Sequence, residues 1–405
     1  MTSGYRTFLQ AFGLGTALGL APAIAQDDAT DISTLIELAQ NAAAQDVISL
    51  PGGQLADILT EADDAQRDRL IAELSAGDTD ALLGTLALWV LAGTTDFVPG
   101  GVLDTVATER PLAAQLLFVV LIGAVGVKAA LVPFHAWLPL AMVAPAPVSA
   151  LLHAVAVVKA GAFGIMRVVY EVFGIDTAQA LGMTAPLAAL AGITIIYGSL
   201  RAITQDDIKK RLAYSTVSQV SYITLGVALV SPIAALGAIA HLIHQGLMKI
   251  TMFMAAGNLA EGLGVKKVSA MDGVGRAMPG TMLAFSLAAL AMIGLPPLAG
   301  FVSKWYLAQG GLDAGAPWVI ALLLASSLLN AIYFLPMLHR AWFRDAPEGA
   351  TETPTRPRIG WMLAAPPIAT AAMVLVAGGL ANAPISPLEW TRFIVSLEFQ
   401  EFDRR

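Results

Sequence analysis

Ionisable side chains that stand inside long apolar stretches are the first candidates for chemistry in this sequence. Lys128 closes a run that carries no charge after Arg110, and Lys304 follows the apolar stretch 281–298. A lysine within a lipid-like interior costs at least about 2.5–3.5 kcal/mol. Such a side chain snorkels to the interface, pairs with an acid or exchanges protons. For each lysine taken singly, these three interpretations stay open.

Proline-rich interruptions stand beside both lysines. Lys128 precedes the segment 133–139 (PFHAWLP), and Lys304 follows the segment 294–300 (GLPPLAG). Proline removes a backbone donor and interrupts a helix, and broken membrane helices are tolerated only where they line a wet or protein-enclosed cavity. Two such breaks in separate parts of one chain predict inverted repeats and an ion path near mid-membrane depth. A re-entrant turn or a helix end is the structural alternative.

A third cluster lies in one long apolar run. His241, Gln245 and Lys249 are four residues apart and share a helical face, and His244 adjoins it. Histidine titrates near neutral pH and desolvation lets a buried lysine do so, so this face could pass a proton. The alternative is that the histidines only bond a neighbouring helix. No carboxylate or thiolate stands near His241 and His244 in sequence, so we expect no metal site here.

The run after Pro147 carries His153, Lys159 and Arg167. His153 and Lys159 do not share a helical face, so no pair is predicted between them. Arg167 is expected to snorkel. Lys159 stays ambiguous between a structural and a functional role.

The amino-acid composition predicts that these residues lie in a lipid bilayer. Hydrophobic residues make up 57% of the chain and charged residues 13%, against about 25% charge in ordinary soluble domains. Cysteine is absent, which excludes disulfides, thiolate zinc sites and cysteine-bound iron–sulfur clusters. No basic stripe with interleaved aromatics indicates a nucleic-acid partner. An integral membrane protein of the all-α class is therefore predicted.

The apolar runs predict a bundle of about nine membrane helices, two of them interrupted by proline. Three basic loops, at 201–211, 266–276 and 340–358, are separated by pairs of spans, so the positive-inside rule places all three in the cytoplasm. The predicted spans are 82–92 (short for a span), 112–132, 147–173, 185–200, 214–230, 232–259, 281–298, 318–339 and 361–380.

The N-terminal fifth differs from the membrane body. Residues 1–25 fit either a cleaved signal peptide or a first membrane helix. From Asp27 to Asp80 the chain carries thirteen acidic and two basic residues, a local net charge of −11. We expect 26–80 to be an acidic, non-cytoplasmic amphipathic segment, with a linker as the alternative. Residues 81–345 then form the membrane domain, and 346–405 the last membrane helix and a C-terminal tail.

Several motifs together resemble one known family. They are the segments 128–161, 207–219 (DIKKRLAYSTVSQ), 241–249 and 294–304. These motifs resemble those of the antiporter-like proton-channel subunits of respiratory complex I and of multisubunit Mrp-type Na+/H+ antiporters. The segment 153–161 (HAVAVVKAG) is most similar to the Mrp D-type subunit. The resemblance implies a polytopic helical fold with two inverted repeats and a hydrated axis of lysines and histidines.

The resemblance also implies roles for individual residues. Lys128 matches the lysine of the family's first broken helix, and Lys304 that of the second. His153 and Lys249 match the ionisable residues between them. These four form the expected proton path, supported by His241, His244, Gln245 and Lys159. No cofactor or metal is expected in the chain.

The chain also departs from the family pattern. The helix whose glutamate partners the broken-helix lysine is not found upstream of Lys128, and Gln245 stands where the family commonly has histidine. The first repeat is therefore expected to be incomplete and the second complete.

We expect a proton-translocating subunit of an Mrp-type antiporter in a bacterial inner membrane, with other membrane subunits as partners and Na+ as a further candidate ion. The alternatives are a non-redox membrane-arm subunit of complex I or of a membrane-bound hydrogenase, and a shortened structural subunit without transport.

Overall fold

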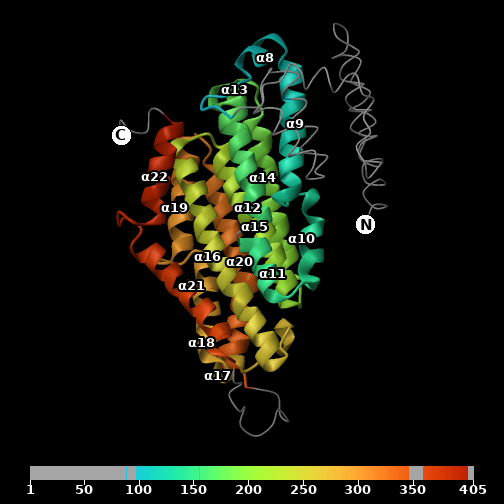
Figure 1. Cartoon of the computed structure of the whole chain (residues 1–405), viewed down its shortest axis with the longest axis vertical. Helices are drawn as coiled ribbons and strands as arrows, with labels where there is room; N and C mark the ends of the chain where they lie inside the picture. The colour runs from blue at the N-terminus through green and yellow to red at the C-terminus, as the bar shows by residue number, and fades with distance from the viewer. Residues whose placement is uncertain (1–87, 89–96, 155, 346–358, 400–405) are drawn as a thin grey trace, which may run out of the picture. The chain divides into compact units, whose positions relative to one another are not determined.

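The computed structural model describes residues 88, 97–154, 156–345 and 359–399, and the regular secondary structure of these residues is helical (Figure 1). They contain no β-strand, only an isolated bridge between Asp207 and Lys267. The predicted all-α class is confirmed. The predicted segments 1–25 and 26–80, and all of the apolar run 82–92 except Leu88, lie outside the described residues.

The chain divides into two compact units. One comprises residues 1–96 and 102–124, and the other residues 97–101 and 125–405. In the first, the described residues form α8 (Asp104–Glu109) and most of α9 (Pro111–Lys128). Leu117 and Phe118 of α9 are buried. The last turn of α9, with Lys128, belongs to the second unit, as do all the other candidate residues.

The second unit is a bundle whose helices run roughly along one direction (Figure 1). Three short elements lead into it: the 3₁₀ turn Phe134–Ala136, α10 (Trp137–Leu140) and the 3₁₀ turn Ala141–Val143. The remaining helices are α11 (Ala146–Ala154), α12 (Val157–Arg167) with a π-helical continuation (Val168–Phe173), α13 (Ile175–Ala180), α14 (Thr184–Ile203), α15 (Ile208–Ala228), α16 (Pro232–Leu263), α17 (Val274–Ala277), α18 (Pro279–Ile293), α19 (Ala299–Asp313), α20 (Trp318–Phe343), α21 (Trp361–Gly379) and α22 (Pro387–Glu398).

Six helical segments among the described residues are long and apolar enough to cross a membrane. The prediction of about nine spans stays a prediction. Helix α15 has 21 residues, but its many hydroxyl and amide side chains keep it out of this group. The six are α9, the stretch Ala146–Phe173, α14, α16, α20 and α21.

Local signals set the ends of the long helices. The Asp207 side chain accepts a hydrogen bond from the Lys210 amide and caps α15. Ser231 caps α16 in the same way, Pro232 fills its first position, and Gly264 ends it with φ +69°. Helix α16 therefore extends over 32 residues without a break. It packs against α11, α15, α18, α19, α21 and α22 and forms the centre of the unit.

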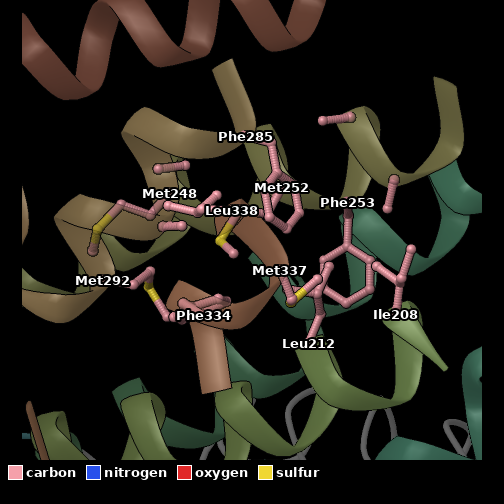
Figure 2. Packing of buried hydrophobic residues seen from close by; sticks show 14 of the residues in the cluster. Ile208, Leu212, Met248, Met252, Phe253, Phe285, Met292, Phe334, Met337 and Leu338 are labelled. Carbon is pink, nitrogen blue, oxygen red and sulfur yellow. The ribbon is translucent and has the colours of Figure 1, made fainter. Parts of the chain in front are cut away.

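A hydrophobic cluster surrounds the second half of α16. Met248, Met252 and Phe253 of α16 belong to this cluster together with Phe285 of α18 and Phe334 of α20 (Figure 2). In a membrane the surrounding lipid is as apolar as these side chains, so close packing stabilises such contacts rather than removal from water. Methionine suits this because its flexible thioether fills irregular gaps.

Both predicted helix breaks are present. Helix α9 ends at Lys128, and the following residues include Ala130 with a left-handed φ of 56°. Helix α18 ends at Ile293, Gly294 has φ +100°, and α19 begins at Ala299. The predicted pair of proline-interrupted helices is confirmed.

A third interruption was not predicted. Helix α21 ends at Gly379, and α22 begins at Pro387, inside the segment that the sequence analysis expected to be a tail. Ser386 caps α22 by accepting a hydrogen bond from the Glu389 amide. The chain beyond the last predicted span therefore returns to helix and packs on α16.

Candidate functional site

Lys304 is held by uncharged oxygens at the second break. Its ammonium donates to the carbonyls of Met292 (2.9 Å) and Ile293 (3.0 Å) and to the Ser327 hydroxyl (3.1 Å). These carbonyls belong to the last turn of α18, where helix carbonyls lack intrahelical partners and the helix dipole is negative. The break thus creates a cation cradle, and Lys304 fills it with only 7% of its surface exposed.

His241 connects three helices beside this cradle. Its Nδ1 lies 2.8 Å from the Ser303 hydroxyl of α19, next to Lys304. Its ring lies 5.2 Å from that of Tyr222 on α15, and the Lys304 ammonium lies 5.3 Å from the same tyrosine ring. The Tyr222 hydroxyl donates to Ser326 at 2.7 Å. Tyr222 therefore stands between the two ionisable residues.

Lys249 occupies a second uncharged cradle further along α16. It is fully buried, and its ammonium donates to the Leu212 carbonyl (3.0 Å) and to the Ser215 hydroxyl, both on α15. Eight residues of α-helix separate it from His241, which corresponds to about 12 Å along the axis. Both residues contact α15, as the predicted shared face requires.

Lys159 lies on the same axis, although the sequence left its role ambiguous. It is 6% exposed, and its ammonium donates to the Leu242 carbonyl at 2.6 Å. Leu242 follows His241 directly on α16. A snorkelling lysine would reach solvent, so the buried position argues against that interpretation. Among the described residues, neither Lys159, Lys249 nor Lys304 forms an ion pair.

Three further predicted residues are buried near these lysines. His153 stacks on Phe253 of α16 with ring centroids 4.6 Å apart. His244 and Gln245 are fully buried. Within the described part of the chain, the ring nitrogens of His153 and the amide atoms of Gln245 have no hydrogen-bond partner. Buried polar groups normally find a partner in protein or water, so this part of the bundle is suited to hydration.

Lys128 differs from the other lysines. Its side chain is exposed, whereas the sequence analysis placed it in an apolar interior. The break that follows it is ordered by two hydrogen bonds: the Trp137 indole donates to the Val127 carbonyl (2.7 Å), and the Val132 amide donates to Thr194 (3.2 Å). The structure therefore presents Lys128 at the surface of this chain and Lys159, Lys249 and Lys304 inside it.

The uncharged members of the site are not marked by the sequence. Ser215, Tyr222, Ser303 and Ser327 contact the predicted lysines and histidine, but none carries a charge that marks it in an apolar run. One signal was available, because α15 buries an unusual run of polar side chains. They are Ser215, Thr216, Ser218, Gln219, Ser221, Tyr222 and Thr224.

Arg211 also has a different place from the one expected. The sequence analysis counted it with a cytoplasmic basic loop, but it lies in the first turn of α15 and is 8% exposed. Its guanidinium donates to the carbonyls of Gln205 (2.8 Å), Tyr333 (2.9 Å) and Ile203 (3.3 Å). It therefore fastens the α14–α15 connection to α20 rather than facing solvent.

The fold and the site define a class: polytopic helical membrane proteins with ionisable side chains buried beside broken helices. Residues 71–330 match the family described as NADH:quinone oxidoreductase/Mrp antiporter, TM. This match covers more than half of the chain, and the chain belongs to this family. The resemblance noted in the sequence is confirmed.

Relatives of two kinds share this similarity. The chain is 40% identical over 272 residues to NADH-quinone oxidoreductase subunit N of Desulforudis audaxviator, covering 66% of this chain and 53% of the relative. It is 35% identical to the A/B component of a probable K(+)/H(+) antiporter of Rhizobium meliloti, over 63% of this chain and 25% of the relative. The chain thus spans about half the length, or less, of these curated relatives.

Solved structures have the same fold. A chain of the Mrp complex from Dietzia sp. matches with a TM-score of 0.69 and 24% identity, covering 84% of this chain and 69% of the other. A chain of respiratory complex I from Thermus thermophilus with bound aureothin matches with a TM-score of 0.59 and 26% identity, over 79% and 69%. The antiporter-like membrane fold is therefore present here.

Proposed function

We propose that this chain is a proton-translocating subunit of a multisubunit cation/proton antiporter of the Mrp type. The observation that carries the proposal is the set of three buried lysines, Lys159, Lys249 and Lys304, each held by uncharged oxygens. A buried cation is costly, and a membrane protein retains it where it has a function. The family relationship supports the same function.

The cradles explain how these lysines could exchange protons. A carboxylate partner favours the charged form of a lysine and so holds its proton. Carbonyl and hydroxyl oxygens accept hydrogen bonds from an ammonium and also, more weakly, from a neutral amine, because both carry N–H donors. Lys304 and Lys249 can therefore keep their positions in both protonation states.

His241 is suited to pass a proton beside Lys304. The contact with Ser303 fixes one ring nitrogen, and the other, Nε2, is buried without a hydrogen-bond partner among the described residues. A histidine oriented through one nitrogen uses the second for transfer. In this proposal Lys249, His153 and His244 continue the path along α16, and Gln245 and Lys159 support it. Lys128 serves the first half-channel.

A second function is favoured by a specific observation. The relative with 40% identity belongs to an NADH-quinone oxidoreductase, so a membrane-arm subunit of a redox complex is the alternative. The purified complex distinguishes the two functions: NADH- or hydrogen-driven quinone reduction supports the redox assignment, and cation-dependent proton exchange without it supports the antiporter. In both cases the proposed location is a bacterial inner membrane.

The direct test is Lys304→Ala in membrane vesicles that contain the whole complex. We expect loss of cation exchange driven by a pH gradient, because the cradle on α18 then has no titratable group. Lys210→Ala is the matched control, since Lys210 is exposed at the start of α15. Normal exchange by a normally assembled Lys304→Ala complex would refute the proposed role.

A further inference from the structure

Each helix break lies against one glycine of a neighbouring helix. At the first break the glycine is Gly161 of α12, where a Cβ atom would meet the Ala129 nitrogen at 2.2 Å and the Lys128 carbonyl carbon at 2.6 Å. At the second break the glycine is Gly378 of α21. A Cβ atom there would meet the Pro297 oxygen at 2.2 Å and the Ala299 nitrogen at 2.5 Å.

These contacts involve backbone against backbone. Cβ atoms essentially never approach non-bonded heavy atoms below 3.0 Å, so any side chain at Gly378 would displace the segment from Pro297 to Ala299. Backbone of this kind cannot rotate away as a flexible side chain does. Small residues allow such close approach between membrane helices. The neighbouring Gly379 provides a contrast, because a Cβ atom there meets nothing within 4 Å.

A second contact joins the same C-terminal helices to the other side of the break. On α22, Arg392 donates to the Tyr306 hydroxyl of α19 at 3.0 Å, and Glu389 accepts from the same guanidinium at 2.9 Å. Tyr306 lies two residues after Lys304. The pair α21–α22 therefore contacts the break before Lys304 through Gly378 and the helix after it through Arg392.

The break is also the part of the chain that builds the Lys304 cradle. The carbonyls of Met292 and Ile293 immediately precede the break. Gly294 packs against the Lys304 side chain, because a Cβ atom added at Gly294 would lie 3.0 Å from Lys304 Cδ. A shift of the segment after Gly294 changes the position of the lysine relative to these carbonyls. Geometry at such sites is sensitive to displacements of about 0.5 Å.

We propose that α21 and α22 brace the second break and that Gly378 is a positioning residue for Lys304. Because Gly378 has no side chain, α21 can approach the break closely. This contact holds the α18 carbonyls within hydrogen-bond distance of the Lys304 ammonium. The effect on transport rests on the proposed function. The structural part, that Gly378 sets the position of the break, does not.

The transport test compares Gly378→Ala with Gly379→Ala in vesicles that contain the whole complex. We expect Gly378→Ala to lower exchange about tenfold and to shift its pH profile, as a misplaced reacting group does. Gly379→Ala should match the wild type. A pH shift separates positioning from a general loss of stability, which lowers the amount of active complex without moving the profile. Equal rates and profiles for both variants would overturn the proposal.

A second measurement reads the break itself. The chain has no cysteine, so a single Leu295→Cys substitution, at a residue that is 42% exposed, can be labelled without background. Labelling by a membrane-permeant maleimide should become faster when Gly378→Ala pushes the segment away from α21, and should not change with Gly379→Ala. Unchanged labelling in the Gly378→Ala protein would overturn the brace, whatever the transport result.

The two proposals fail separately. A transporting Lys304→Ala complex refutes the role of the lysine and leaves the labelling result intact. If Gly378→Ala reduces the amount of complex, Tyr306→Phe tests the other contact, because it removes only the hydroxyl that Arg392 binds. We expect Tyr306→Phe to speed the labelling of Leu295→Cys as well. An unchanged rate in that variant would count against the brace.

Discussion

Lys249 is the residue whose environment most sharply separates a functional from a structural lysine. Its ammonium is fully buried, and its acceptors are one carbonyl and one hydroxyl on α15. A lysine kept only for stability would gain more from an acidic partner or from replacement by an apolar residue. In the proposed function, the neutral acceptors keep the residue in place while leaving its proton exchangeable.

The hydroxyl of Ser215 can therefore be tested alone. Ser215→Ala removes one acceptor from a buried ammonium, and hydrogen bonds to charged groups contribute about 1.5–3 kcal/mol, so exchange should fall by a factor of about 10 to 150. The measurement is pH-gradient-driven exchange in vesicles. Ser221→Ala is the control, because that hydroxyl donates to the Val217 carbonyl of its own helix at 3.0 Å. Equal activities of the two variants would contradict the role of Ser215.

At the scale of elements, the α14–α15 connection and the segment after α16 are fastened to each other. The Asp206 carboxylate accepts hydrogen bonds from the hydroxyl (2.8 Å) and the amide (2.9 Å) of Ser269. The backbones of Asp207 and Lys267 form an isolated antiparallel β-bridge. The hydrogen bond from the Ser269 hydroxyl is the main reason why the pKa of Asp206 is lowered. These contacts join the start of α15 to the segment that follows α16.

This connection should depend on pH. A carboxyl whose pKa is depressed in the folded state stabilises the fold at pH values above its unfolded-state pKa of about 3.9. This stabilisation disappears as the pH falls through the folded-state pKa. At neutral pH, Asp206→Asn should therefore accelerate hydrogen exchange at the Ser269 amide. Glu261→Gln, at an exposed carboxylate near the end of α16, should not. An unchanged exchange rate at the Ser269 amide in Asp206→Asn would show that the carboxylate charge does not stabilise this connection.

The sequence predicted the elements better than the contacts between them. The breaks beside Lys128 and Lys304 follow from local proline and glycine signals, which act within a few residues. The partners of the lysines depend on how α15, α18 and α20 pack, and Ser215 or Ser327 carries no charge to mark that position. The exposure of Lys128 was missed, and the role of Lys159 stayed ambiguous, for the same reason: helical spacing alone does not tell which face of a helix meets a neighbour.

At the scale of the whole molecule, the chain has the fold of subunits that are found in larger assemblies. It spans about half, or less, of its curated relatives. The described residues concentrate ionisable groups around one helix, α16, which carries His241, His244 and Lys249. It contacts α19, the helix of Lys304, and its Leu242 carbonyl accepts the hydrogen bond of Lys159. The proposed path is thus organised around a single continuous element.

The length of α16 links this path to the thickness of the bilayer. Its 32 residues extend about 48 Å, against a hydrocarbon core of about 30 Å, so the helix must tilt or protrude. Changes in lipid chain length alter helix tilt at a cost of fractions of a kcal/mol per ångström of mismatch. A tilt of α16 moves His241 and Lys249 by different amounts against α15. We therefore expect exchange by the complex reconstituted in lipids of graded acyl length to show an optimum, and a flat dependence would indicate that α16 keeps its tilt.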